Sequence, residues 1–368
     1  MKIGIITFQY ANNYGALLQA YALRKYLLDL GNEVRIINYD NSKLYMKNRS
    51  LRKKIITKVW MAISFFLGRN KKYKKFEMFR NNYLMLEKNK ITNKNHLYQY
   101  IADLNFDVYI VGSDQVWNPY ITMNDDIYYL SFSDSKKKIA YAASFGVDDF
   151  PYEYKNIFLK CINKFNFISV REKTGKNILN KMGITDISIV LDPVFLLGKN
   201  QWSDFAEIKE YEPYIFCYYM PGDKKCEENI KEIALKLKNK FGYKIINIGR
   251  KEYKKFLNDG IDIVSASPNE FLGYFKNASF IITNSFHGTA FSLIFEKNFY
   301  SVVNLSNSGK GKLSSRIVDL LESIGLKNNI IDNDSENIDN IFIDYDEIKF
   351  KINMLKEQSK NFLETALG

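Results

Sequence analysis

Short apolar runs alternate with amphipathic segments along most of the chain, a pattern typical of α/β proteins. Residues 2–7 form an apolar run, residues 16–27 carry apolar side chains at helical spacing, and residues 34–38 form the next apolar run. A strand, a crossover helix and a second strand in this order produce a parallel pair, because parallel strands need a long connection. The first fifth of the chain therefore predicts a βαβ unit.

The alternation continues in two series, one on each side of Asp192-Pro193. In the first series we expect strands at 108–111, 138–143, 167–170 and 187–190, with helices at 152–164 and 172–182. In the second series we expect strands at 214–219, 244–247, 280–283 and 300–303, with helices at 227–241, 267–276, 289–295 and 313–324. The two series predict an α/β enzyme with two halves and a cleft.

These patterns predict that the chain has three parts. We expect an N-terminal domain at residues 1–195 and a C-terminal domain at residues 196–345. Within the first, a stretch at about residues 44–90 is dense in Lys and Arg, with aliphatic and aromatic residues between them, and predicts a helical basic insertion. Residues 346–368 have helical spacing, which predicts a final helix that can return to the first domain.

Composition limits the kinds of partner, metal site and cellular compartment that fit this chain. Lys plus Arg is 53 and Asp plus Glu is 41, so the net charge is +12 and an anionic partner is expected. The cysteines Cys161, Cys217 and Cys226 are odd in number and lack CxxC spacing, which argues against a disulfide scaffold and favours a reducing cytoplasm. With only His96 and His287, a multi-histidine metal site is excluded. We expect neither a signal peptide nor a membrane-spanning segment.

Polar and glycine-containing segments follow several of the predicted strands. Ligands of open parallel sheets bind beyond the carboxyl ends of the strands, so these segments are candidates for lining a binding site. They lie at residues 9–15, 112–118, 144–146, 171–172, 192–193 and 284–289.

A histidine at the start of a predicted helix is the most informative single residue. His287 follows a strand and stands between Ser285 and the pair Gly288-Thr289. A helix N-terminus binds phosphate through backbone N–H groups and its dipole, and an imidazole there can donate to an anion or move a proton. The alternative is that His287 caps the helix and packs, but its place in a polar segment favours function.

Two charged residues after strands are further candidates. Arg171 can form a bidentate pair with phosphate or carboxylate, and the alternative is an ion pair with Glu172. Asp114 can act as a base or hydrogen-bond acceptor, and the alternative is a turn cap. We interpret Asp192-Pro193 as a turn at the domain boundary.

A basic, glycine-containing segment lies at residues 308–312. It lacks the spacing of a Walker A loop, so an ATPase is not expected. Together with Arg316 it can close over an anion, and the alternative is a solvated loop.

Six segments occur in an order that marks one enzyme family. They read NYGALLQAYAL (13–23), GSDQVWN (112–118), YAASFG (141–146), SVRE (169–172), LDP (191–193) and TNSFHGT (283–289). With this set the chain resembles the polysaccharide pyruvyl transferase family from residue 2 to about residue 325. The resemblance implies two Rossmann-like domains facing a cleft, as in GT-B-like glycosyltransferases. It also implies an enzyme that moves pyruvyl from phosphoenolpyruvate to the hydroxyls of a sugar, usually as a ketal.

The resemblance also suggests where the reaction occurs. We expect His287 and Asp114 to be catalytic. Donor binding is expected at Arg171, Ser285, Gly288, Thr289, Lys310, Lys312 and Arg316, and acceptor binding at Asn13, Tyr14, Gly15, Gln115, Trp117 and Ser144. Family members often carry Arg where Ser285 stands, so we expect Lys310, Lys312 or Arg316 to supply the missing charge. No metal and no cofactor besides the co-substrate phosphoenolpyruvate are expected.

The acceptor implied by the resemblance is a sugar of a bacterial capsule, exopolysaccharide or wall polymer, in some relatives carried on a lipid diphosphate. The basic and apolar residues of 51–76 can rest on an anionic membrane, which would make a cytoplasmic enzyme peripheral. The favoured alternative is a helical pair packed on the first domain. Nucleic acid is not an expected partner, because the basic residues are spread out.

Two other functions remain open. A GT-B glycosyltransferase would bind a nucleotide sugar through the helix that begins near His287. A non-catalytic family member would bind glycan or a partner protein, which the absence of Arg at position 285 favours. The donor that binds distinguishes these functions: phosphoenolpyruvate for pyruvyl transfer, a nucleotide sugar for a glycosyltransferase, and neither for a non-catalytic protein.

Overall fold

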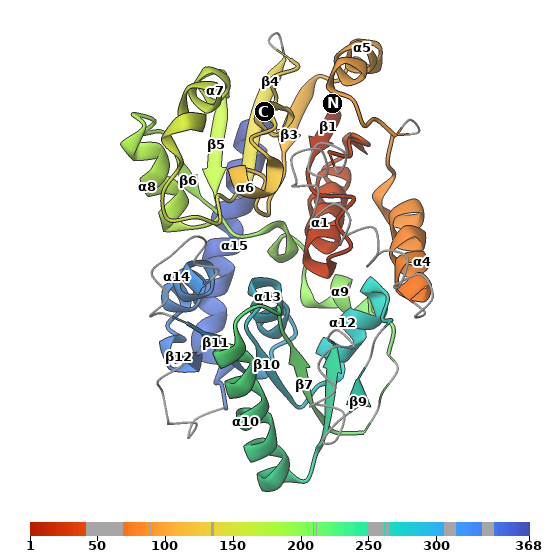
Figure 1. Ribbon diagram of the computed structural model, residues 1–368, viewed down its shortest axis with the longest axis vertical. Helices are drawn as coiled ribbons and strands as arrows, with labels where there is room; N and C mark the ends of the chain where they lie inside the picture. The colour runs from red at the N-terminus through yellow and green to blue at the C-terminus, as the bar shows by residue number, and fades with distance from the viewer. Residues whose placement is uncertain are drawn as a thin grey trace, which may run out of the picture. The chain divides into compact units, whose positions relative to one another are not determined.

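The computed structural model describes residues 1–41, 69–87, 90–133, 136–208, 210, 212–248, 261–262, 265–304, 314–332 and 342–368. The chain forms two compact units (Figure 1). The first comprises Met1–Leu196 together with Leu355–Gly368, and the second comprises Leu197–Met354. Each unit has its own parallel sheet with helices between the strands, which confirms the α/β fold class expected from the alternating pattern.

The first unit contains a six-stranded parallel sheet in the order β2-β1-β3-β4-β5-β6. Its strands are β1 (Lys2–Ile6), β2 (Glu33–Ile36), β3 (Val108–Val111), β4 (Lys137–Ala143), β5 (Phe167–Val170) and β6 (Ser188–Ile189). Its helices include α1 (Tyr14–Asp29), α5 (Lys94–Leu104), α6 (Pro119–Thr122), η2 (Asp126–Tyr129), α7 (Tyr152–Ile162), α8 (Lys173–Lys181) and η3 (Pro193–Phe195). Because β2 and β3 flank β1 on opposite sides, the chain changes direction across the sheet at β1.

Residues 69–84 of the basic insertion are helical. Helix α4 (Arg69–Phe79) continues into a π-helical turn, η1 (Arg80–Leu84), and residues 44–68 of the predicted helical stretch lie outside the described residues. Phe76 of α4 is fully buried and packs on Tyr14 of α1, with ring centroids 4.9 Å apart. After the turn, Leu86 and Ile91 form isolated bridges beside β2, so the insertion extends the edge of the first sheet.

The second unit contains another parallel sheet, in the order β12-β11-β10-β7-β8-β9. Its strands are β7 (Tyr214–Tyr218), β8 (Lys244–Ile248), β9 (Ile261–Asp262), β10 (Phe280–Thr283), β11 (Asn298–Val303) and β12 (Ile330–Asp332). Its helices include α9 (Lys199–Phe205), α10 (Lys224–Phe241), α12 (Pro268–Asn277), α13 (Phe286–Ile294), α14 (Ser314–Ile324) and η4 (Lys327–Asn329). Numbered within the unit and read from β9, the order is 3-2-1-4-5-6, which is that of a Rossmann domain.

Helix α15 (Tyr345–Leu367) leaves the second unit and ends in the first, since its residues from Leu355 belong there. The Tyr26 hydroxyl donates to Glu364 Oε1 at 2.8 Å, and the Leu191 N–H donates to Ser359 Oγ at 2.8 Å. Among the described helices, none is both long and apolar enough to cross a bilayer.

Candidate active site

The strand order of the second unit reverses between β7 and β10, and the loops that follow these two strands are joined there. Asn284 makes the connection with its side-chain amide. The Met220 N–H donates to Asn284 Oδ1 at 2.6 Å, and Asn284 Nδ2 donates to the Met220 carbonyl at 3.0 Å. Ligands of open α/β sheets bind at such a reversal, so this is the expected binding position of the unit.

Helix α13 begins directly after the loop that contains Asn284. Ser285 is its N-cap, and the Ser285 hydroxyl accepts from the Gly288 N–H at 3.4 Å. His287 lies in the first turn and is 7% exposed. A Cβ on Gly288 would lie 2.1 Å from Thr283 Oγ1, so a glycine is needed for the helix to approach β10 this closely. This close approach fixes the start of α13 against β10. His287 therefore lies at a fixed helix N-terminus, where backbone N–H groups and the helix dipole stabilise anions.

The other residues expected to bind the donor have different surroundings. Thr289 is fully buried, and its hydroxyl donates to the Ser285 carbonyl at 3.2 Å and lies 2.7 Å from Ser301 Oγ. The Thr289 hydroxyl thus joins α13 to β11, and donor binding at Thr289 stays a prediction. Arg316 lies at the start of α14 and is 5% exposed. Lys310 and Lys312 lie outside the described residues.

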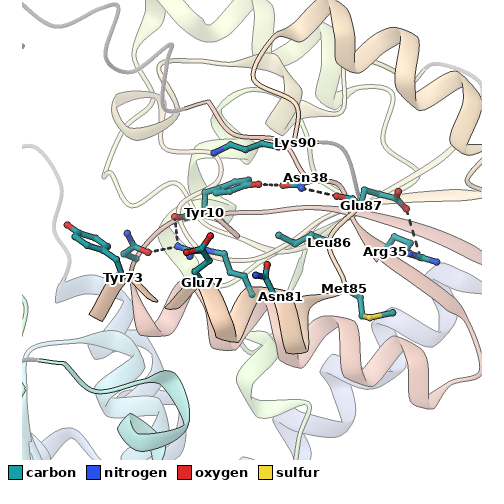
Figure 2. Close-up of a pocket in the computed structure, with 12 residues that line it drawn as sticks. Tyr10, Arg35, Asn38, Tyr73, Glu77, Asn81, Met85, Leu86, Glu87 and Lys90 are labelled. Carbon is teal, nitrogen blue, oxygen red and sulfur yellow. Dashed lines mark hydrogen bonds and ion pairs between the residues drawn. The ribbon is translucent and has the colours of Figure 1, made fainter. Parts of the chain in front are cut away.

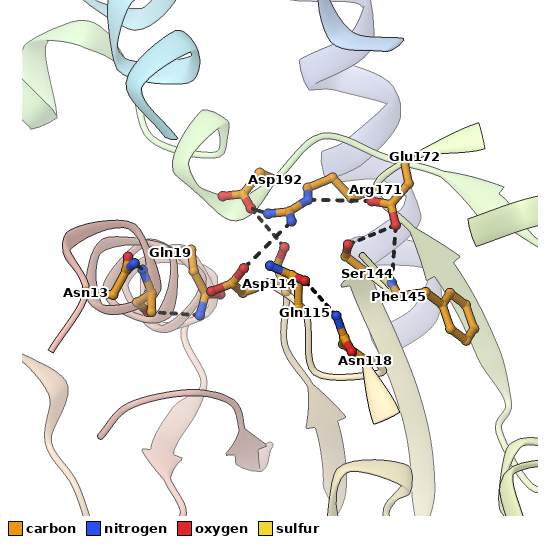
Figure 3. Close-up of polar contacts among 12 residues, drawn as sticks. Asn13, Gln19, Asp114, Gln115, Asn118, Ser144, Phe145, Arg171, Glu172 and Asp192 are labelled. Carbon is orange, nitrogen blue, oxygen red and sulfur yellow. Dashed lines mark hydrogen bonds and ion pairs between the residues drawn. The ribbon is translucent and has the colours of Figure 1, made fainter. Parts of the chain in front are cut away.

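In the first unit, a buried arginine stands among three carboxylates (Figure 3). Arg171 follows β5 and places Nη1 2.6 Å from Asp192 Oδ2, Nε 3.7 Å from Glu172 Oε2 and Nη2 3.8 Å from Asp114 Oδ1. Burial alone lowers the pKa of the guanidinium, but the attraction of these carboxylates outweighs burial and raises that pKa. For Arg171 the structure shows an ion-pair network in place of the expected clamp on an anionic donor.

Further hydrogen bonds fix the carboxylates around Arg171. Ser113 Oγ donates to Asp192 Oδ2 at 2.9 Å, and Glu172 Oε1 accepts from Ser144 Oγ at 2.8 Å and from the Phe145 N–H at 3.2 Å. Asp192 is fully buried. Asp192 also caps the turn η3 close to the boundary between the units, as its interpretation predicts, but its place in the network was not predicted. The available signal was a carboxylate directly after an apolar strand, the same signal that singled out Arg171.

Asp114 is the most accessible carboxylate of this network. Its side chain is 16% exposed, against 3% for Glu172 and 0% for Asp192. Its φ of 66° is left-handed, a conformation that costs free energy in residues other than glycine and concentrates at functional sites. Asp114 can therefore meet a ligand while Arg171 orients it. Among the described residues, including this network, no group of three His, Cys, Asp or Glu side chains is arranged so that it could hold a metal ion.

Three residues expected to bind the acceptor belong to the core instead. Trp117 is fully buried, and its indole N–H donates to the Tyr128 carbonyl at 3.2 Å. Ser144 is fully buried against Glu172, and Tyr14 is 3% exposed beneath α4. Side chains buried to this extent offer little surface to a sugar, and acceptor binding at these three residues stays a prediction.

The other three acceptor predictions lie at loop and helix boundaries. Asn13 is the N-cap of α1 and accepts from the Ala16 N–H at 3.2 Å, and Gly15 is buried in the first turn of that helix. Gln115 is half-buried and accepts from Asn118 Nδ2 at 2.8 Å. A Cβ on Gly146 would lie 2.0 Å from Gln115 Oε1, so this amide occupies the space that the glycine leaves.

Comparisons with known proteins agree with this architecture. The family model described as polysaccharide pyruvyl transferase matches residues 13–307. A search of curated proteins found no sequence match. The structure of an S. aureus MnaA–UDP complex has a TM-score of 0.54 and 15% identity, covering 100% of this chain and 96% of that one. A UDP-N-acetylglucosamine 2-epimerase structure has a TM-score of 0.56 and 10% identity, covering 100% and 95%. These likenesses show the fold, two Rossmann-like domains as in GT-B enzymes.

Proposed function

The chain belongs to the polysaccharide pyruvyl transferase family, and on that premise we propose that it transfers pyruvyl from phosphoenolpyruvate to a sugar of a bacterial surface polysaccharide or its lipid-linked precursor. The observation that carries the proposal is the family match over residues 13–307, which includes the loop and helix start around His287. Phosphoenolpyruvate carries a phosphate and a carboxylate, in keeping with the basic composition of the chain.

The reaction consumes two sugar hydroxyls and one phosphoenolpyruvate. Protonation of the donor methylene makes C2 electrophilic, and one hydroxyl oxygen forms a bond to C2. The C2–O bond to phosphate then breaks, and the second hydroxyl closes the ketal. One hydroxyl proton replaces the proton given to the methylene, and the other leaves with phosphate. The enzyme must therefore stabilise anions and supply an acid and a base.

On the donor side we assign His287 as the phosphate ligand or proton donor. It sits in the first turn of α13, where backbone N–H groups and the helix dipole favour an anion. Ser285 and Gly288 support it, Ser285 by capping the helix and Gly288 by allowing its close approach to β10. Arg316, buried near the start of α14, a helix that contacts α13, is the cation we assign in place of the family arginine at position 285.

On the acceptor side we assign Asp114 as the carboxylate that orients a sugar hydroxyl. Arg171 acts through Asp114 as a positioning residue, because its charge is already shared among three carboxylates. This assignment differs from an anion clamp in a testable way. Substitution of Arg171 would change the kcat for transfer through Asp114 and leave stabilisation by phosphoenolpyruvate nearly unchanged.

The test is a thermal shift of the full chain with phosphoenolpyruvate, with UDP-N-acetylglucosamine and with inorganic phosphate. A ligand at about 100 times its Kd adds about 2.7 kcal/mol of stability, which moves the unfolding midpoint by several degrees. We expect a shift with phosphoenolpyruvate that His287→Ala removes. The matched control is His96→Ala, which changes the other histidine at an exposed position on α5.

The alternatives predict different results. A shift with UDP-N-acetylglucosamine alone would assign the chain to nucleotide-sugar chemistry. A phosphoenolpyruvate shift of equal size in His287→Ala would remove the role given to His287. Mass spectrometry of sugars incubated with enzyme and phosphoenolpyruvate then tests transfer itself, through the mass of a ketal and an equal yield of phosphate.

A further inference from the structure

Two pockets of the first unit adjoin the loop that follows β1. The aromatic pocket, about 430 Å³, is lined by Phe8, Tyr10, Tyr39, Asp40, Tyr120 and Tyr128, among others. The polar pocket, about 620 Å³, is lined by Tyr10, Arg35, Asn38, Arg80, Glu87 and Lys90, among others, and Figure 2 shows it. Both volumes are in the range of small-molecule sites. Tyr10 lines both pockets, so the two pockets adjoin each other.

The loop between the pockets is fixed by two buried side chains. Gln9 Nε2 donates to the Ile37 carbonyl at 3.2 Å and to the Tyr39 carbonyl at 2.6 Å, which ties it to the end of β2. Arg80, from the π-helical turn of the insertion, donates from Nε to the Gln9 carbonyl at 2.9 Å and from Nη2 to the Tyr10 carbonyl at 3.0 Å. The walls are therefore held in place before a ligand arrives, which lowers the entropic cost of binding.

The lining of the aromatic pocket combines ring faces with one carboxylate. Tyr120 is 47% exposed at the rim, while Tyr128 is buried in the floor and meets Phe8 edge to face at 5.3 Å. Asp40 is held by Lys90, whose Nζ lies 2.8 Å from Asp40 Oδ2. A pyranose ring presents an apolar C–H face and hydroxyl donors around its edge. Aromatic rings suit the first, and a carboxylate suits the second.

The charges of the polar pocket favour a neutral ligand over a phosphorylated one. The Arg80 guanidinium donates to loop carbonyls, and Lys90 pairs with Asp40. Arg35 lies 3.9 Å from Glu87 Oε1, and the Tyr100 hydroxyl donates to Glu87 Oε2 at 3.0 Å. The cations are thus partly engaged by oxygens of the protein itself, whereas a diphosphate site needs them for the ligand. The amides, hydroxyls and paired charges of this pocket can donate hydrogen bonds to sugar hydroxyls and accept hydrogen bonds from them.

We infer that the acceptor glycan occupies both pockets, with one pyranose ring in the aromatic pocket and the next sugar in the polar pocket beyond Tyr10. The inference rests on the proposed function and specifies its acceptor as a glycan of at least two sugars. It places two sugars of the acceptor at the carboxyl ends of β1 and β2, where ligands of such sheets bind, and away from the buried Tyr14, Trp117 and Ser144. Asp114 lines neither pocket, so the hydroxyl that it orients belongs to a neighbouring sugar of the same glycan.

The test is retention of the full, labelled chain on an array of immobilised mono-, di- and trisaccharides, with and without phosphoenolpyruvate. The wild type should be retained by glycans of two or more sugars and more weakly by their single sugars. Tyr120→Ala should lower that retention about tenfold, as expected for loss of an aromatic contact, and Asp40→Asn should lower it with the side-chain shape kept. Tyr152→Ala is the matched control, because Tyr152 is 86% exposed on α7 and lines neither pocket.

Three results of the array would overturn the inference: no glycan retained by the wild type, equal retention of single sugars and longer glycans, or unchanged retention in both Tyr120→Ala and Asp40→Asn. Stabilisation by UDP that Tyr120→Ala removes would assign the aromatic pocket to a nucleotide base and would also overturn it. Failure of the proposed function can be distinguished from failure of this inference, because the thermal shift with phosphoenolpyruvate and its dependence on His287 are measured without an acceptor.

Discussion

Replacement of Arg171 by methionine tests the ion-pair network most directly. The side chain of Arg171 is 1% exposed, and its two closest carboxylates, Asp192 and Glu172, are 0% and 3% exposed. The substitution keeps the apolar stem but leaves these carboxylates buried without their cation. Removal of one partner of a buried ion pair costs about 3–5 kcal/mol, so we expect the first unit to lose about that much stability at neutral pH.

The loss should depend on pH with a definite sign. In the variant, desolvation favours the protonated carboxyls in the folded state, so the folded chain binds more protons than the unfolded chain. Stability then falls as pH rises, and the penalty is largest at neutral pH and shrinks toward about pH 4, where unfolded carboxyls are also protonated. In the wild type the raised pKa of Arg171 keeps the guanidinium charged throughout this range.

Hydrogen exchange in urea, read by mass spectrometry on peptides from β3, β4 and β5, measures the stability of the first unit separately from the second. The control is Arg35→Met, because Arg35 is 35% exposed and its ion pairs are 3.8 Å and 3.9 Å long, worth at most about 1 kcal/mol. A loss below about 1 kcal/mol for Arg171→Met, or the same loss at pH 5 and pH 8, would refute the reasoning.

Three further predictions follow from the second unit and the insertion. Gly288→Ala places a Cβ 2.1 Å from Thr283 Oγ1 and should cost about 1–3 kcal/mol in urea unfolding, and it should also weaken the phosphoenolpyruvate shift. Asn284→Asp removes the donor to the Met220 carbonyl; we expect a loss of about 1–3 kcal/mol in the same assay, and an unchanged midpoint would contradict the joined loops. Flotation tests whether the exposed lysines of α4 touch a membrane. We expect no flotation with anionic or neutral vesicles, because α4 packs on α1 through Phe76; flotation with anionic vesicles alone would contradict this and favour a peripheral contact.

Local sequence determined the elements and several of their ends. The apolar run 280–283 is β10, and Ser267, Pro268 and Glu270 start α12 with a capping box at the predicted start of that helix. Their signals act within a few residues, which is why they can be read without a fold. The order of motifs likewise indicated the family and, through it, the GT-B fold.

Strand order and side-chain neighbours were decided by the tertiary structure. Asp114, Arg171 and Asp192 lie far apart in the chain, and only the parallel order of β3, β4, β5 and β6 brings their strand ends together. The motif at 112–118 predicts acceptor binding at Trp117, yet this side chain packs in the core against Phe158.

The pockets beside Tyr10 likewise could not be predicted from local sequence. They require Arg80, 70 residues further along the chain, to hold the loop after β1. Sequence specifies which side chains are available near a strand end. Which of them face a ligand depends on long-range packing, because burial and pairing are properties of neighbours that the chain brings together only when it folds.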